Sequence, residues 1–69
     1  MPHIAITMYA GRTQEQKQKL ANRIQELVQE ELGVDKKVIS VSVEDIPKEK
    51  WADNMKQFPD DIMYVKPGI

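Results

Sequence analysis

Pro2 offers the most unusual chemistry in this chain, because it directly follows Met1. A small residue after the initiator allows Met1 to be removed, and Pro2 would then carry a secondary amine at the chain end. A terminal amine has a reference pKa of about 7.7–8.0, and apolar surroundings or a nearby cation would lower it. We therefore expect Pro2 to be able to act as a general base near neutral pH. The structural alternative is that Pro2 only begins a strand, where proline is tolerated.

The elements that must position Pro2 follow from the spacing of apolar residues. Residues 2–8 alternate with the period of two that is typical of a strand with one apolar face. Thr13 and Gln16 fit a capping box at the start of a helix over residues 14–32, and Gly33 is well placed to end it. The apolar residues of this helix recur at spacings of three and four, which places them on one face. They are Leu20, Ala21, Ile24, Leu27, Val28 and Leu32.

A second strand is predicted over residues 38–43, with Ser40 and Ser42 on the side opposite its apolar residues. A strand, a long helix and a second strand make a βαβ unit, whose strands should run parallel through a right-handed crossover. The predicted fold class is therefore α+β, a small βαβ unit with two parallel strands and one long helix.

The pattern is weaker after this second strand. Residues 44–51 are rich in turn signals, and Pro47 is able to start a short helical turn. We expect a brief helix over residues 52–58 and a short third strand over residues 62–65.

The length of 69 residues predicts a single domain, residues 1–69, which cannot build a large core alone. The chain has no cysteine, so disulfides and thiolate metal sites cannot reinforce it. Association between copies is the remaining support, and we expect an obligate homo-oligomer. The net charge of −1 comes from 10 basic and 11 acidic residues spread along the chain, which argues against a nucleic-acid partner. The sequence shows neither a signal peptide nor a membrane span, so we expect no membrane partner and a cytoplasmic protein.

The start Met1-Pro2, the pair Gly11-Arg12 before a capped helix, the length and the βαβ order together resemble the 4-oxalocrotonate tautomerase family of the tautomerase superfamily. The resemblance covers residues 2–51 in the order and spacing of the elements. The segments 46–51 and 65–68 also look like the short bacterial branch of this family.

The resemblance implies a cofactor-independent isomerase without a metal. Pro2, freed by removal of Met1, would be the general base in the keto–enol tautomerisation of a small 2-oxo or unsaturated carboxylic acid. Arg12 would bind the substrate carboxylate and Trp51 would line the pocket. The second arginine of the family is expected at Ser42 and is absent here. This absence favours a monocarboxylate substrate, such as a phenylpyruvate-type enol, over a dicarboxylate.

The strand places Pro2 and Arg12 far apart within one copy. At about 3.3 Å per residue the intervening strand is roughly 20 Å long, so one chain cannot bring both residues onto one small substrate. If both act, the site must lie between subunits. The assembly would be a dimer, or a trimer of dimers.

Two other functions stay open on the sequence. The same scaffold can add water to haloacrylates, a hydratase or dehalogenase activity that needs a water-activating group, and no acidic residue near Pro2 is evident. A non-catalytic oligomeric binding protein is the other alternative, and Ser42 in place of an arginine favours it. Among further polar residues, His3 has the parity of a sheet-face residue, and Lys66 is a candidate replacement for the missing arginine.

Overall fold

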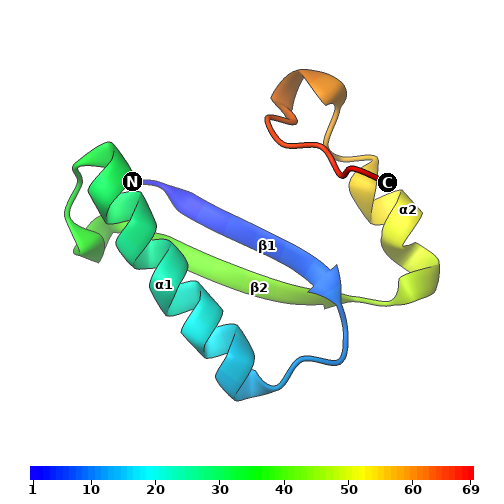
Figure 1. The fold of residues 1–69 in the computed structure, drawn as a ribbon, viewed down its shortest axis with the longest axis horizontal. Helices are drawn as coiled ribbons and strands as arrows, with labels where there is room; N and C mark the ends of the chain where they lie inside the picture. Colours follow the sequence, from blue (N-terminus) through cyan, green and yellow to red (C-terminus); the bar gives the residue numbers. More distant parts are fainter.

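The computed structural model describes residues 1–69, and a two-stranded parallel sheet with one long helix forms its main body (Figure 1). The predicted α+β class and βαβ unit are confirmed. In chain order the elements are β1 (His3–Tyr9), α1 (Gln14–Leu32), the 3-10 turn η1 (Lys36–Val38), β2 (Ser40–Ile46), the 3-10 turn η2 (Lys48–Lys50), α2 (Trp51–Met55) and the 3-10 turn η3 (Asp60–Ile62).

Helix α1 begins and ends where the sequence signals predicted. The Thr13 hydroxyl accepts from the backbone N–H of Gln16 at 3.0 Å, and the Gln16 side chain accepts from the backbone N–H of Thr13 at 3.0 Å. At the other end Gly33 has a φ of 66° and donates its N–H to the carbonyl of Gln29 at 2.9 Å. Both ends therefore satisfy backbone groups that a helix otherwise leaves free.

Strand β2 differs from the predicted strand at both ends. It starts at Ser40, because the preceding residues form η1, and it continues to Ile46 through residues assigned to a turn. Pairing with β1 explains the extension, since the parallel register runs from His3 opposite Ser40 to Tyr9 opposite Ile46. The predicted turn at Pro47 is confirmed as η2.

The predicted third strand over residues 62–65 is wrong. Residues 60–62 form η3 instead, and the sheet has two strands. Tyr64 and Val65 are 95% and 87% exposed. No other strand of this chain lies beside the segment to pair with its backbone, so the β preference of its residues does not produce a strand.

The two faces of the sheet have different surroundings. Helix α1 covers one face, and Lys17 of α1 forms an ion pair with Asp45 of β2 at 3.1 Å. The chain after β2 turns toward the other face, where Asn54 of α2 donates to the Thr7 hydroxyl at 3.2 Å. Figure 1 shows α1 running across the sheet and α2 beyond the end at which both strands finish. None of the helices has both the length and the apolar character that a membrane crossing requires.

Burial within one copy is slight. Only Ile39 and Ile46 are buried, at 5% and 7% exposure. The apolar face predicted for α1 is wider than the sheet can cover, and Leu27 and Leu32 stay 50% and 61% exposed. A single copy thus leaves a large part of its apolar surface in water.

Candidate active site

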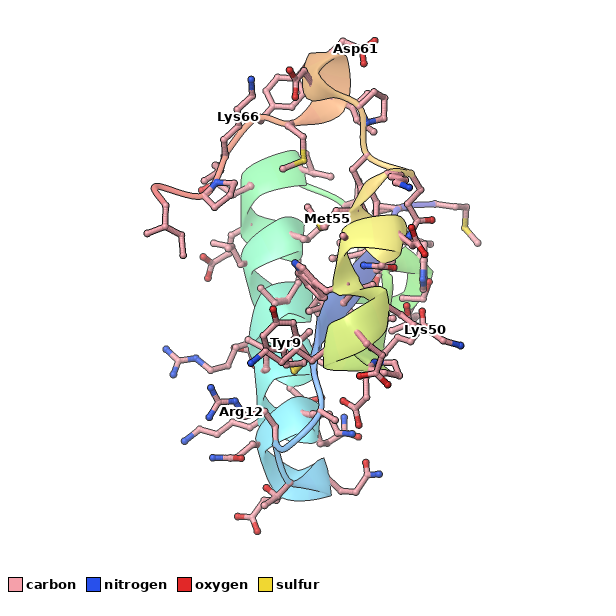
Figure 2. The ribbon with its side chains drawn as sticks, turned by 90° about the vertical axis from the view of Figure 1, so that its right-hand side faces the viewer. Tyr9, Arg12, Lys50, Met55, Asp61 and Lys66 are labelled. Atoms are coloured by element: carbon pink, nitrogen blue, oxygen red, sulfur yellow. The ribbon has the colours of Figure 1, made fainter.

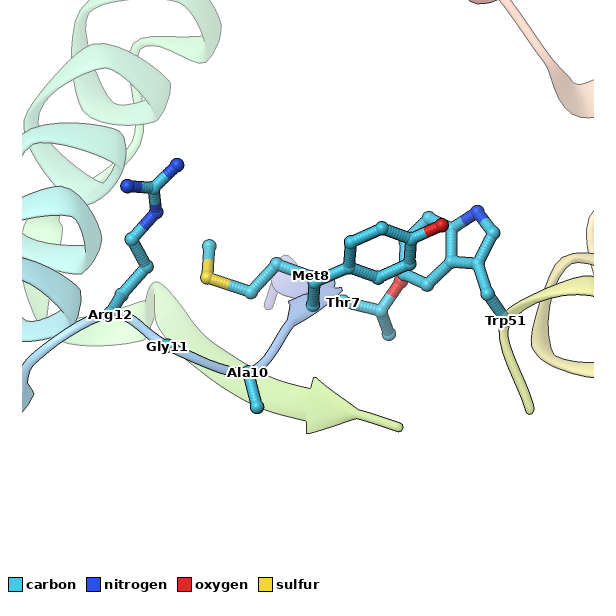
Figure 3. A pocket seen from close by; sticks show the side chains of 7 residues that line it. Thr7, Met8, Ala10, Gly11, Arg12 and Trp51 are labelled. Carbon is cyan, nitrogen blue, oxygen red and sulfur yellow. The ribbon is translucent and has the colours of Figure 1, made fainter. Parts of the chain in front are cut away.

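A solvent-accessible hollow of about 660 Å³ lies where β1 ends. Residues 7–12 form most of its lining, and Trp51 closes it from the first turn of α2 (Figure 3). Its volume is typical of small-ligand sites, which measure about 300–1,000 Å³. The structure therefore brings together two of the three residues predicted for the site, Arg12 and Trp51.

Arg12 extends into this region from the loop between β1 and α1. Gly11 precedes it with a φ of 125°, a backbone conformation that residues with a side chain rarely adopt. This turn lets the chain leave the strand and enter the capped helix within a few residues. The Arg12 guanidinium forms none of the ion pairs or side-chain hydrogen bonds of the chain and is exposed (Figure 2). A free guanidinium beside a hollow can bind a carboxylate through two parallel hydrogen bonds.

Trp51 reaches the hollow through long-range strand pairing. Tyr9 lies opposite Ile46 at the end of the sheet, and η2 then turns the chain so that Trp51 packs against Tyr9. The two ring centroids are 5.1 Å apart and the ring planes meet at 78°. This edge-to-face arrangement is one that aromatic pairs prefer.

Pro2 lies at the other end of β1 and does not line the hollow. Its carbonyl accepts from the backbone N–H of Ser40 at 3.2 Å, at the point where the sheet begins. Met1 precedes it, so the Pro2 nitrogen is an amide nitrogen here. Within one copy the structure thus separates Pro2 from Arg12 by the length of the strand, as predicted.

His3 joins two serines on the sheet face away from α1. Its Nδ1 lies 2.7 Å from the Ser40 hydroxyl, and its Nε2 lies 3.1 Å from the Ser42 hydroxyl. Ser42, the position expected to carry an arginine, is thus hydrogen-bonded to an imidazole. The placement of His3 on a sheet face agrees with its parity in the sequence.

Lys66 does not replace the missing arginine within this hollow. It lies in the C-terminal segment, where its ammonium group is 3.7 Å from a carboxylate oxygen of Asp60 (Figure 2). Both side chains are largely exposed, so this ion pair contributes little to stability.

Tyr9 and Met8 also line the hollow beside Arg12, and neither was among the site residues predicted from the sequence. The position of these two residues in the sequence could have indicated that they line the site. Both residues immediately precede the loop with Gly11 and Arg12, and a strand end next to a functional loop commonly contributes to a site.

Comparison with known proteins identifies related sequences. The model of a family described as tautomerase enzymes matches residues 2–60. The chain belongs to the tautomerase family. The resemblance inferred from Pro2, Gly11-Arg12 and the βαβ order is therefore confirmed.

Individual tautomerase relatives support the same assignment. The chain is 43% identical over 51 residues to a "probable tautomerase" of Xylella fastidiosa, an alignment that covers 74% of this chain and 62% of that protein, less than two thirds of its length. It is 35% identical over 60 residues to the 2-hydroxymuconate tautomerase of Bacillus subtilis, with 87% of this chain and 97% of that protein covered. A "probable tautomerase" of Bacillus cereus is likewise 35% identical over 60 residues, covering 87% and 98%. Family and relatives together support an isomerase.

Proposed function

We propose that this protein is a cofactor-independent isomerase that catalyses the keto–enol tautomerisation of a small 2-oxo or unsaturated carboxylic acid. The observation that carries the proposal is the unpaired Arg12 guanidinium at a hollow closed by Trp51, in a chain of the tautomerase family. Arg12 would anchor the substrate carboxylate, and Trp51 would bound the space for the rest of the molecule.

The base in this proposal is the amine of Pro2, exposed when Met1 is removed. In the ketonisation of a 2-hydroxy-2-enoate, the amine takes the proton of the enol hydroxyl and delivers a proton to C3. The C2–C3 double bond becomes a single bond, and C2 becomes a carbonyl. A positioned base of suitable pKa typically accelerates such a proton transfer about 10²–10⁴-fold. The Arg12 charge would stabilise the negative charge that the substrate develops between the two proton transfers.

The complete site in this proposal lies between copies, with Pro2 from one subunit and Arg12 from another. Two observations support a homo-oligomer. Pro2 precedes β1 and Arg12 follows it, so the strand separates them within one copy, and only two residues of the isolated chain are buried. A neighbouring copy would both cover apolar surface and bring a terminal amine to the hollow.

The test compares two preparations of the same chain, one with Met1 removed and one with Met1 retained, as verified by mass spectrometry of the intact protein. The processed form should ketonise a 2-hydroxy-2-enoate, and the form with Met1 should be inactive because its Pro2 nitrogen is an amide. Pro2→Ala in the processed form should lose activity as well. Equal activity with and without Met1 would refute Pro2 as the base. A processed form that binds carboxylates without turnover would support the non-catalytic alternative.

A further inference from the structure

The aromatic side of the hollow is built from two rings that hold each other in place. Tyr9 contacts Trp51 edge-to-face, with ring centroids 5.1 Å apart. Tyr9 is nevertheless 49% exposed, so about half of its surface is free to contact a ligand. A ring fixed on one side and free on the other presents apolar surface with little further loss of side-chain freedom on binding.

The opposite side of the same hollow carries one charged group, the Arg12 guanidinium. Figure 3 shows the Met8 thioether between Arg12 and Trp51, so an apolar surface connects the guanidinium to the aromatic pair. No acidic side chain and no second basic side chain lines the hollow. One end of a bound ligand would therefore meet a positive charge, and the other end would meet uncharged, largely aromatic side chains.

This asymmetry discriminates between classes of carboxylic acid. A ligand with one carboxylate and one flat apolar group matches both ends. A dicarboxylate would place its second charge against the rings of Tyr9 and Trp51, where only the neutral Tyr9 hydroxyl and Trp51 indole N–H can donate a hydrogen bond and no cation of this chain compensates for the loss of water. The uncharged end would thus disfavour the second carboxylate.

We propose that Tyr9 is a specificity-determining residue, and that its ring, packed on Trp51, selects 2-oxo acids with an aryl group on C3 over dicarboxylates. The inference rests on the proposed function for the identity of the reaction. The selectivity itself concerns binding, and it can be measured without turnover.

The experiment uses three carboxylates that cannot tautomerise: 3-phenylpropanoate, butanoate and adipate. Trp51 is the only tryptophan in the chain, so its indole N–H gives one assignable NMR signal at the hollow. Titrations that follow this signal yield a Kd for each ligand. We expect 3-phenylpropanoate to bind more tightly than butanoate, and adipate to bind no more tightly than butanoate.

Variants of Tyr9 then distinguish the contribution of its aromatic ring to binding from the contributions of its side-chain volume and its hydroxyl. Tyr9→Leu should weaken binding of 3-phenylpropanoate about two- to tenfold, the amount expected for one aromatic contact, and should leave butanoate unchanged. Tyr9→Phe keeps the ring and should bind like the parent chain. Tyr64→Leu is the matched control, because Tyr64 is 95% exposed and lies outside the hollow.

Three results would overturn the inference: no preference for 3-phenylpropanoate in the parent chain, tighter binding of adipate than of 3-phenylpropanoate, or an equal loss for all ligands in Tyr9→Leu. None of these measurements requires Pro2 to act as a base. A failure of the proposed function would appear as absent turnover with the ligand preference intact, and a failure of this inference would appear as turnover without the preference.

Discussion

Arg12 carries a positive charge that no acidic residue of its own chain neutralises. Its exposed position next to Gly11 keeps the guanidinium in water, so the free protein does not bear the cost of burying an unpaired charge. A substrate carboxylate would provide the missing partner. The strength of a hydrogen bond to a charged group, about 1.5–3 kcal/mol, indicates how much binding this single residue can supply.

Substitution of Arg12 tests this role. We expect Arg12→Gln in the processed protein to lower kcat/KM for a 2-oxo acid enol about ten- to a hundredfold, because charged hydrogen bonds of this strength are lost. Arg23→Gln removes the only other arginine of the chain, which lies on the surface of α1 outside the hollow, and should have little effect. Steady-state kinetics of both variants give the comparison. Equal kcat/KM values for the two variants would remove Arg12 from the site.

The helices and strands of this chain differ in whether neighbouring or distant residues determine where they begin and end. The bounds of α1 could be predicted from the sequence, because Thr13, Gln16 and Gly33 act within one turn of the helix ends. The end of β2 could not, because Ile46 belongs to the strand only through its pairing with Tyr9, 37 positions earlier in the chain. The third strand predicted over residues 62–65 failed for the same reason. A strand needs a partner, and this segment has none within the chain.

The candidate site shows the same division between local and long-range causes. Arg12 could be predicted from its position between Gly11 and the helix cap. The contact of Trp51 with Tyr9 could not, because it depends on the register of the sheet and on the turn η2. The link between His3 and both serines likewise follows from the pairing of β1 with β2.

The contribution of the N-terminal cap of α1 to stability can be tested by substitution of Thr13. Thr13→Ala should lower the free energy of unfolding by about 1 kcal/mol, because the Gln16 backbone N–H loses its acceptor. Thr13→Ser keeps a hydroxyl at the same place and should retain most of the stability. Urea unfolding of both variants at one chain concentration gives the measurement. A Thr13→Ser variant as unstable as Thr13→Ala would show that the hydroxyl hydrogen bond is not the stabilising feature.

The molecule has a larger accessible surface than a compact monomer of the same mass. Its accessible surface is 5903 Å², whereas a compact monomer of 8.0 kDa would expose about 4,450 Å². Its radius of gyration of 13.5 Å likewise exceeds the roughly 11 Å expected for a compact 69-residue domain. The excess area per chain is of the size that stable protein interfaces bury, about 800 Å² or more per partner. These dimensions support the proposed homo-oligomer.

The molecular mass in solution tests the proposed homo-oligomer. We expect sedimentation equilibrium at micromolar chain concentration to give a multiple of 8.0 kDa, because the apolar residues that one copy exposes need a partner surface. The mass should stay constant on dilution through the micromolar range. A species of 8.0 kDa that remains folded by circular dichroism would contradict the proposal.

Subunit complementation can show whether Pro2 of one copy and Arg12 of another form one site. Processed Pro2→Ala and Arg12→Gln chains are mixed in equal amounts, unfolded together in denaturant and refolded, with each variant and the parent chain treated alone as controls. If each site takes its base and its cation from different copies, random assembly gives about a quarter of the sites both native residues. We expect the mixture to recover about a quarter of the parent activity, well above the mean of the two variants alone. An activity equal to that mean would contradict a site shared between copies.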